Sequence, residues 1–282
     1  MIPYRLNPLG IRVNEVIPLT LTAQQAGSTV KLTATGSPTV SGLHYRLGKS
    51  GTWLAYTIGN TITLSNVGDS VQFWNSAETL SSSTSAYVQF SGTGLFSCRG
   101  NLQSMLNYIN SAPDYCFAYL FRYFPMANTP EMPAETLREY AYTSLYRDNP
   151  YLTLTEDLPA VLVPNYAYGN MYAGSGVIMP PKIKATQYLV GSLAGMFSGC
   201  TGLLEAPKLL PTMISNSCLL LAFNNCSNMT KIEVNFTSWG TGDPTSNWVS
   251  GVAASGTFIK PSALPEEYGV DKIPSGWTVV NK

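Results

Sequence analysis

The chain has 282 residues, with 16 basic and 16 acidic side chains and therefore no formal net charge. This length can bury a sizeable core and hold two domains, and the balanced charge argues against a nucleic-acid partner, which requires a basic field. Charged residues make up only 11%, against about 25% in an average soluble protein, which indicates a turn-rich β or repeat architecture. No stretch reaches the roughly 18 apolar residues of a membrane span, so we expect no membrane insertion.

Residues 1–15 are expected to form an extended arm. Arg5, Asn7 and Arg12 interrupt its apolar residues, so it lacks the continuous apolar region of a secretory signal. With Met1 at the start, this indicates a chain that folds in the cell that makes it. The arm is too short to fold alone and would gain order on a partner chain. Its candidate anchoring residues are Pro3, Tyr4, Leu6, Pro8, Leu9 and Ile11.

Residues 16–99 alternate apolar and polar side chains in the short runs "LTLTA", "TVKLTAT", "LHYRL", "TITL", "SVQFW" and "YVQFSG". Turn-forming residues separate these runs at intervals of about ten residues, a spacing typical of an antiparallel sandwich or barrel. Within this region, "NVGD" at 66–69 is predicted to be a tight turn. Residues 101–109 are predicted to form a helix that leads into the next region.

A repeat occupies residues 100–236. An aromatic residue recurs every 25 or 26 residues, and an aliphatic residue follows it by six positions in four of the five units. A fixed period of this kind is typical of a solenoid. The predicted repeat core is Phe121, Tyr146, Tyr172, Phe197, Phe223, Leu152, Ile178, Leu203 and Met229.

Each repeat unit is predicted to combine a short helix or 3₁₀ turn, such as "NSCLLLAF", with a turn and a short extended piece. Pro207 and Pro211 exclude a long strand or helix in the extended piece of the fourth unit. One unit cannot bury its own apolar face, so the units are expected to stack. The predicted fold class is therefore mainly β with an α/β solenoid.

Residues 237–282 are predicted to cap the last coil, because an uncapped end would expose core. "DPTSNWVSGVA" carries an N-cap signal at Thr245 or Ser246 and is expected to form a short helix. "GTFIK" and "GWTVV" are expected to be strands.

The sequence contains no recognisable catalytic, metal or cofactor site. His44 is its one histidine, and five rather than four residues separate the glycines of "GLHYRLGKS" from each other, which does not match a phosphate-binding loop. The acidic pairs lie in Pro-flanked turns and are expected to be solvated; they are Glu131/Glu135, Glu156/Asp157 and Glu266/Glu267. We expect no cofactor.

The five cysteines share repeat positions with Ala and Ser, which predicts buried reduced thiols. A bridge between Cys200 and Cys226 in neighbouring coils is the alternative. Tyr115, Tyr140 and Tyr166 lie in a repeat register and are expected in the core.

A binding surface is expected where polar or aromatic side chains fall outside the core registers. Polar residues recur one coil apart, and exposed tyrosines can stack on sugars or contact proteins. The candidate surface residues are Thr153, Thr155, Glu205, Lys231, Tyr119, Tyr123, Tyr151 and Tyr188.

The stretches "MFSGCTGLLEAPKLLP" and "AFNNCSNMTKIEV" resemble the BspA-like leucine-rich repeats of gut Bacteroidetes and of the phages that infect them. The resemblance covers residues 115–236 and is strongest in the last two units, whereas Asn149 and Ser175 replace the turn cysteine in the middle units. The flanking regions resemble the small β domain that often precedes such repeats and the module that often closes them.

This resemblance implies a phage virion protein, either a head or tail fibre or a capsid decoration, that is made in the host cytoplasm and lies on the virion surface. The implied partners are capsid, portal or tail proteins through the arm, a host-surface glycan or protein through the repeats, and further copies of the chain in a homo-oligomer. A bacterial cell-surface adhesin is the alternative, and a carbohydrate-active enzyme is disfavoured by the missing catalytic residues.

Overall fold

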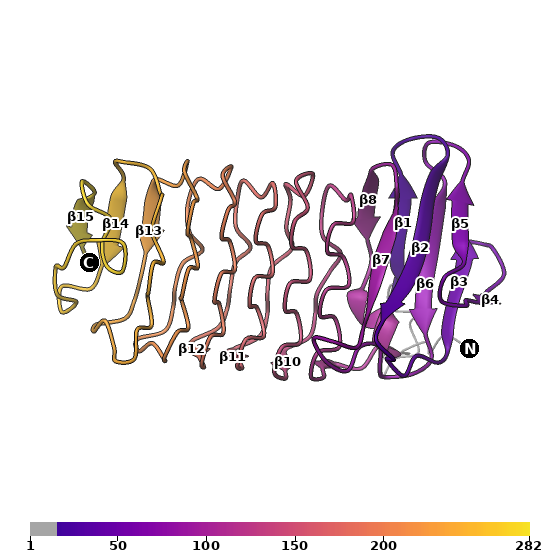
Figure 1. The fold of residues 1–282 in the computed structure, drawn as a ribbon, viewed down its shortest axis with the longest axis horizontal. Coiled ribbons are helices and arrows are strands. Elements are labelled where there is room, and N and C mark those ends of the chain that lie inside the picture. Colours follow the sequence, from indigo (N-terminus) through magenta and orange to yellow (C-terminus); the bar gives the residue numbers. More distant parts are fainter. Residues whose placement is uncertain (1–15) are drawn as a thin grey trace, which may run out of the picture.

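The structure is a computed structural model that describes residues 16–282, so the six candidate anchoring residues of the arm lie outside the described residues. Strands make up 27% of the chain, which confirms the mainly β class. Within residues 16–282 there is one 3₁₀ helix and no α-helix. Figure 1 shows an elongated molecule with the N-terminal strands at one end and successive coils side by side along the long axis.

Eight strands form two antiparallel sheets at the N-terminal end. One sheet has the order β4-β3-β6-β1-β8 and the other has the order β5-β2-β7. The strands are β1 (Leu19–Ala23), β2 (Ser28–Thr35), β3 (Leu43–Leu47), β4 (Leu54–Ala55), β5 (Thr61–Leu64), β6 (Ser70–Asn75), β7 (Tyr87–Thr93) and β8 (Phe96–Arg99). All six predicted runs are therefore strands, and the sequence reading missed only β4 and β8.

Alternation along the strands places one set of side chains between the two sheets. In β2 the burial alternates residue by residue from Ser28 to Thr33, and Phe73 of β6 meets Phe90 of β7 with ring centroids 5.1 Å apart. The predicted turn at 66–69 is present: the Asn66 amide donates to the Asp69 carboxylate at 2.9 Å, and Gly68 adopts a φ of 87°.

The same sheets also cover the first coil. The amide of Phe90 donates to the carbonyl of Leu120 at 2.7 Å, and the Phe90 ring stacks on Phe121 at 4.9 Å. The predicted helix over 101–109 is only the 3₁₀ helix η1 (Leu102–Leu106). It stops there because Asn107 and the next residue, Tyr108, adopt positive φ values of 52° and 59°.

Each coil contains a segment of consecutive turns, which we call the turn segments; they span 113–124, 138–149, 164–175, 189–200 and 215–226. Alternate amides donate to the next coil, as from Tyr119 to the Thr143 carbonyl at 3.0 Å, and the intervening amides donate three residues back within the coil, as from Leu120 to Phe117. Every fourth residue has positive φ, for example 57° at Tyr115 and 62° at Tyr123. Of the predicted short helix or 3₁₀ turn in each unit, the helix is wrong, because left-handed residues and coil-to-coil bonds interrupt the helical bonding pattern. The bonds to the residue three positions back match the 3₁₀-turn alternative.

A continuous column of aromatic rings fills the core of the coils. Its members are fully buried, and neighbouring centroids lie between 4.9 and 5.9 Å apart. The column consists of Phe90, Phe121, Tyr146, Tyr172, Phe197 and Phe223. The five predicted core aromatics are confirmed, as are Leu152, Leu203 and Met229.

Ile178 is a correction to the predicted core. It is 43% exposed, and the preceding residue, Val177, is fully buried in its place. The reason is spacing: one residue separates the buried Ser175 from Val177, whereas two residues separate Cys200 from Leu203 in the next coil.

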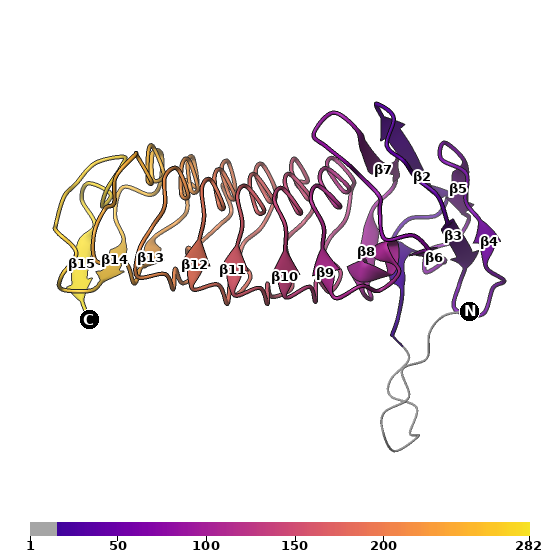
Figure 2. The same cartoon turned by 90° about the horizontal axis from the view of Figure 1, so that it is seen from below.

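Short parallel strand pairings link the coils at two places, both away from the tips of the turn segments (Figure 2). The strands are β9 (Ser111–Ala112), β10 (Thr136–Leu137), β11 (Leu162–Val163), β12 (Gln187–Tyr188), β13 (Lys231–Glu233), β14 (Thr257–Lys260) and β15 (Thr278–Asn281). Strands β9 to β12 each end directly before a turn segment, and β13 to β15 pair at the other edge of the coil (Figure 1). Strands β14 and β15 confirm the strands predicted at "GTFIK" and "GWTVV". The helix predicted near Thr245 is wrong: Asp243 and Asn247 have positive φ, and turns carry the buried Trp248 onto the end of the aromatic column.

Candidate binding face

We call the side of the stack that the turn segments form the turn face. Residues of positive φ occur on it at three positions in each coil. The first coil uses Tyr at all three positions and the fourth coil uses Gly at all three. These positions are therefore aromatic next to the N-terminal sheets and carry no side chain in the fourth coil. The residues are Tyr115, Tyr119 and Tyr123 in the first coil and Gly191, Gly195 and Gly199 in the fourth.

A ladder of stacked tyrosines marks the start of each of the first three turn segments. The rings of Tyr115, Tyr140 and Tyr166 lie 4.8 and 5.1 Å apart and are parallel within 12°. All three are half-buried rather than in the core as predicted. The ladder ends at Gly191, where a Cβ atom would lie 2.3 Å from the Tyr166 ring. Because the rings cover one another's faces, little ring face is left for a ligand.

Next to the sheets, three tyrosines, two arginines and one aspartate form what we call the tyrosine–arginine cluster: Tyr87, Tyr119, Arg122, Tyr123, Arg147 and Asp148. Tyr87 of β7 packs on Tyr119 with centroids 4.6 Å apart. The Arg122 guanidinium lies 4.5 Å from the centre of the Tyr123 ring and donates to its hydroxyl at 2.6 Å. Tyr123 remains 59% exposed.

The charges of the cluster do not balance. Arg122 and Arg147 both approach the same carboxylate oxygen of Asp148, with Nε–O distances of 3.5 and 3.3 Å. Neither Nε atom makes an aligned hydrogen bond with any atom of the described structure. Two guanidinium groups therefore share one carboxylate through loose ion pairs, and the cluster carries one excess positive charge.

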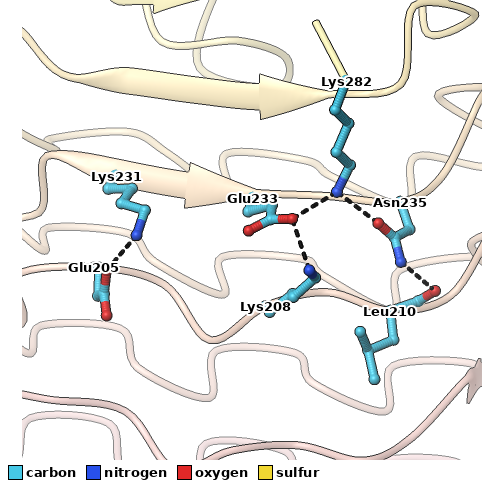
Figure 3. Close-up of polar contacts among 7 residues, drawn as sticks. All are labelled: Glu205, Lys208, Leu210, Lys231, Glu233, Asn235 and Lys282. Atoms are coloured by element: carbon cyan, nitrogen blue, oxygen red, sulfur yellow. Dashed lines mark hydrogen bonds and ion pairs between the residues drawn. The ribbon is translucent and has the colours of Figure 1, made fainter. Parts of the chain in front are cut away.

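The predicted polar residues Glu205 and Lys231 lie on the strand side of the stack, not on the turn face (Figures 2 and 3). They pair with each other at 3.0 Å, and this hydrogen bond raises the pKa of Lys231. Nearby, Glu233 accepts from Lys208 at 2.9 Å and from Lys282 at 2.7 Å. These charges fasten neighbouring coils to one another, which leaves little free charge for a ligand.

The remaining predicted surface residues do not gather into one site. Thr153 and Thr155 are half-buried, and Thr155 donates to the Met179 carbonyl at 3.5 Å. Tyr151 is 56% exposed, as predicted. Tyr188 is a correction: it is 3% exposed, because the alternation of β12 turns Gln187 outward and Tyr188 inward. Burial raises the pKa of Tyr188.

The histidine is engaged within the fold, whereas the acidic pairs lie at the surface. His44 Nδ1 lies 2.7 Å from the Gly42 carbonyl, and its ring packs on Trp74. The six carboxylates of the acidic pairs are exposed, as predicted. Among residues 16–282, no group of three or more His, Cys, Asp or Glu side chains could hold a metal ion, and no helix of this part of the chain is long and apolar enough to cross a membrane.

All five cysteines are buried and form no disulfide, which confirms the predicted free thiols. The Cys200 thiol donates to the Tyr172 carbonyl at 3.0 Å and the Cys226 thiol to the Phe197 carbonyl at 3.1 Å, in each case to the coil before it. Burial raises the pKa of Cys200 to about 11 and that of Cys218 to about 12. These thiols are therefore structural and protonated at neutral pH.

A surface hollow of about 420 Å³ lies beside β3 and β4 and is lined in part by His44 and Tyr56. The Tyr56 hydroxyl donates to the Asn60 carbonyl and accepts from the Leu32 amide at 2.9 Å. Both polar groups are thus engaged within the fold, which makes the hollow a poor candidate for a ligand site.

The sequence reading identified Tyr119 and Tyr123 but missed Tyr87, both arginines and Asp148. A signal existed, because Arg122 and Arg147 lie 25 residues apart, one repeat period, and so occupy equivalent positions in neighbouring coils. Comparison with protein-family models, with curated proteins and with solved structures found no match for this chain.

Proposed function

We propose that this chain is a non-enzymatic structural protein of a bacteriophage virion, a head or tail fibre or capsid decoration, that contacts the host surface through its coils. The observation that carries the proposal is the tyrosine–arginine cluster. Backbone hydrogen bonds between coils hold its exposed side chains in fixed register. Such preorganisation lowers the entropic cost of binding, and Tyr and Arg are the residue types most enriched at binding hot spots.

The proposal interprets the two N-terminal sheets as a β-sandwich and the coils as an irregular leucine-rich-repeat solenoid without helices. Parallel pairing between coils, as between Glu205 and Lys231 or Leu209 and Val234, supports the second interpretation. The sheets at one end and residues 237–282 at the other would then shield the terminal coils from water.

In this interpretation the two ends of the chain have different tasks. Residues 1–15 attach the protein to capsid, portal or tail proteins, and the turn face contacts a host glycan or protein. Several copies in a homo-oligomer on the virion surface would convert modest single contacts into strong attachment through multivalency.

The test is complementation of a phage that lacks the gene. A chain without residues 1–15 should fold but be missing from purified particles, whereas the double variant Tyr123→Ala, Arg147→Gln should be incorporated normally and reduce adsorption to host cells. Normal incorporation of the shortened chain would contradict the anchoring role. Recovery of the chain in a bacterial envelope rather than in particles would contradict the virion role and favour the cell-surface adhesin.

A further inference from the structure

We propose that the tyrosine–arginine cluster binds an acidic saccharide, a glycan whose sugar rings carry carboxylate groups. The choice of a host-surface glycan rests on the proposed function, whereas the carboxylate specificity rests on the geometry of the cluster alone.

Tyr123 supplies a platform for a sugar ring. One side of its ring is occupied by the Arg122 guanidinium, 4.5 Å from the ring centre, and the side chain is still 59% exposed. Tyrosine rings stack on the apolar C–H face of a sugar and offer a hydroxyl for hydrogen bonding. The Arg122 guanidinium also lies 5.8 Å from the centre of the Tyr119 ring. This second contact restrains Arg122 and, through it, the Tyr123 ring.

The two arginines supply the recognition of the carboxylate. Both approach Asp148 through Nε, at 3.5 and 3.3 Å, so the terminal amino groups of Arg147 stay available for a second anion. A guanidinium binds a carboxylate through two parallel N–H donors. One excess positive charge matches one carboxylate per bound sugar residue.

Asp148 keeps both guanidinium groups in place while no ligand is bound. Gly174, in the next coil, leaves the space for this carboxylate, because a Cβ atom there would lie 2.8 Å from Asp148 Oδ1. The ligand is thus met by donors that are already oriented, which limits the cost of ordering two long side chains.

The surroundings favour a saccharide over a nucleic acid or an acidic protein. The chain has no net charge, so it offers no extended basic field for a polyanion with closely spaced charges. The excess positive charge of the cluster lies directly beside the exposed Tyr123 ring, which matches alternating sugar faces and carboxylates.

The experiment is calorimetric titration of the full chain with tetragalacturonate, with its carboxyl-reduced neutral form and with tetraglutamate. We expect tetragalacturonate to bind about tenfold more tightly than either competitor, the size of one charge-assisted hydrogen bond. Arg147→Gln should remove this advantage, and Arg147→Lys should restore only part of it, because lysine lacks the paired donors. Binding should weaken as salt is raised.

Arg138→Gln and Tyr268→Ala are the matched controls, since both side chains are exposed and lie outside the cluster. Neither should change affinity, whereas Tyr123→Ala should weaken binding of both saccharides. Equal affinity for the neutral tetrasaccharide, tighter binding of tetraglutamate, or no binding of tetragalacturonate would each overturn the inference. If adsorption of the complemented phage still depends on Tyr123 and Arg147 in that case, the proposed function stands and only the ligand class is wrong.

Discussion

The first and fourth coils share three backbone positions of positive φ, but the first coil has tyrosine at all three and the fourth has glycine. Tyr115, Tyr119 and Tyr123 adopt φ values of 57°, 62° and 62°, a conformation that costs an L-residue about 1–2 kcal/mol. The glycines at 191, 195 and 199 adopt similar values, between 60° and 75°, without that cost.

This difference shows that the fold requires the positive φ at these positions but does not require tyrosine side chains there. The positive φ is imposed by the ladder of bonds between coils, since it recurs in every coil whatever the side chain. Tyrosine is thus retained in the first coil at a cost in stability. Strained residues of this kind concentrate at functional sites, and in this chain two of the three belong to the tyrosine–arginine cluster.

The largest expected effect concerns what the two coils share. Phe121→Ala in the first coil and Phe197→Ala in the fourth each remove a ring from the buried column, so each should lower the free energy of unfolding by about 3–5 kcal/mol. Urea denaturation of both variants checks this. Loss of stability from only one of them would mean that the aromatic column is not continuous.

The second prediction compares the stability lost on replacing two glycines of the fourth coil with alanine. Gly191→Ala places a Cβ atom 2.3 Å from the Tyr166 ring, whereas at Gly199 the nearest atom is 3.7 Å away. We expect a loss of about 2–4 kcal/mol for Gly191→Ala, from strain and overpacking, and of about 1 kcal/mol for Gly199→Ala, from strain alone. Equal losses would contradict the contact between the ladder and the glycine coil.

The third prediction concerns the third coil, in which Val177 rather than Ile178 occupies the core position. Val177→Ala should cost about 2 kcal/mol because Val177 is fully buried. Ile178→Ala, at a 43% exposed position, should cost less than about 0.5 kcal/mol. Thermal melts of the two variants are the measurement, and the reverse order would restore Ile178 to the core.

The fourth prediction is that glycine stabilises position 123 more than alanine does, although alanine is the better residue at most positions. At Tyr123, glycine should give a variant about 1 kcal/mol more stable than alanine does, because only glycine accepts the positive φ without strain. Both variants should bind tetragalacturonate more weakly than the parent. If alanine is the more stable replacement, the tyrosines of the first coil are not strained and the comparison fails.

The smallest effect belongs to the strand side of the stack. Lys282→Ala removes one partner of Glu233 and should cost less than about 1 kcal/mol, since the pair is partly exposed. Hydrogen bonds from Lys282 and Lys208 lower the pKa of Glu233. Their stabilisation is therefore present above the ordinary pKa of 4.5 and is lost as the pH falls through the lowered value. The difference between variant and parent should shrink in acid and in high salt, to what the hydrogen bond from Lys282 to the Asn235 side chain contributes. A difference that does not change with pH or salt would contradict this electrostatic origin.

The sequence predicted the N-terminal strands well because alternation is a local signal: Ser28, Val30 and Leu32 of β2 are buried and the residues between them are not. It also located the aromatic column, since a period of 25 or 26 residues survives in the sequence. It could not reveal the conformation within a coil, because Tyr115 and Gly191 adopt the same positive φ although their intrinsic preferences differ. The cluster was found only in part, because its arginines become neighbours through stacking of coils.

The most direct test of the central claim, that hydrogen bonds between coils fix the turn face, is amide hydrogen exchange followed by mass spectrometry. The amides of Phe117, Tyr119 and Phe121 donate to the next coil at 2.9–3.0 Å although their segment is neither helix nor strand. Peptides from the turn segments should therefore exchange as slowly as peptides from β2 and β7. Exchange of the turn segments at the rate of an unprotected loop, while β2 and β7 remain protected, would contradict the account.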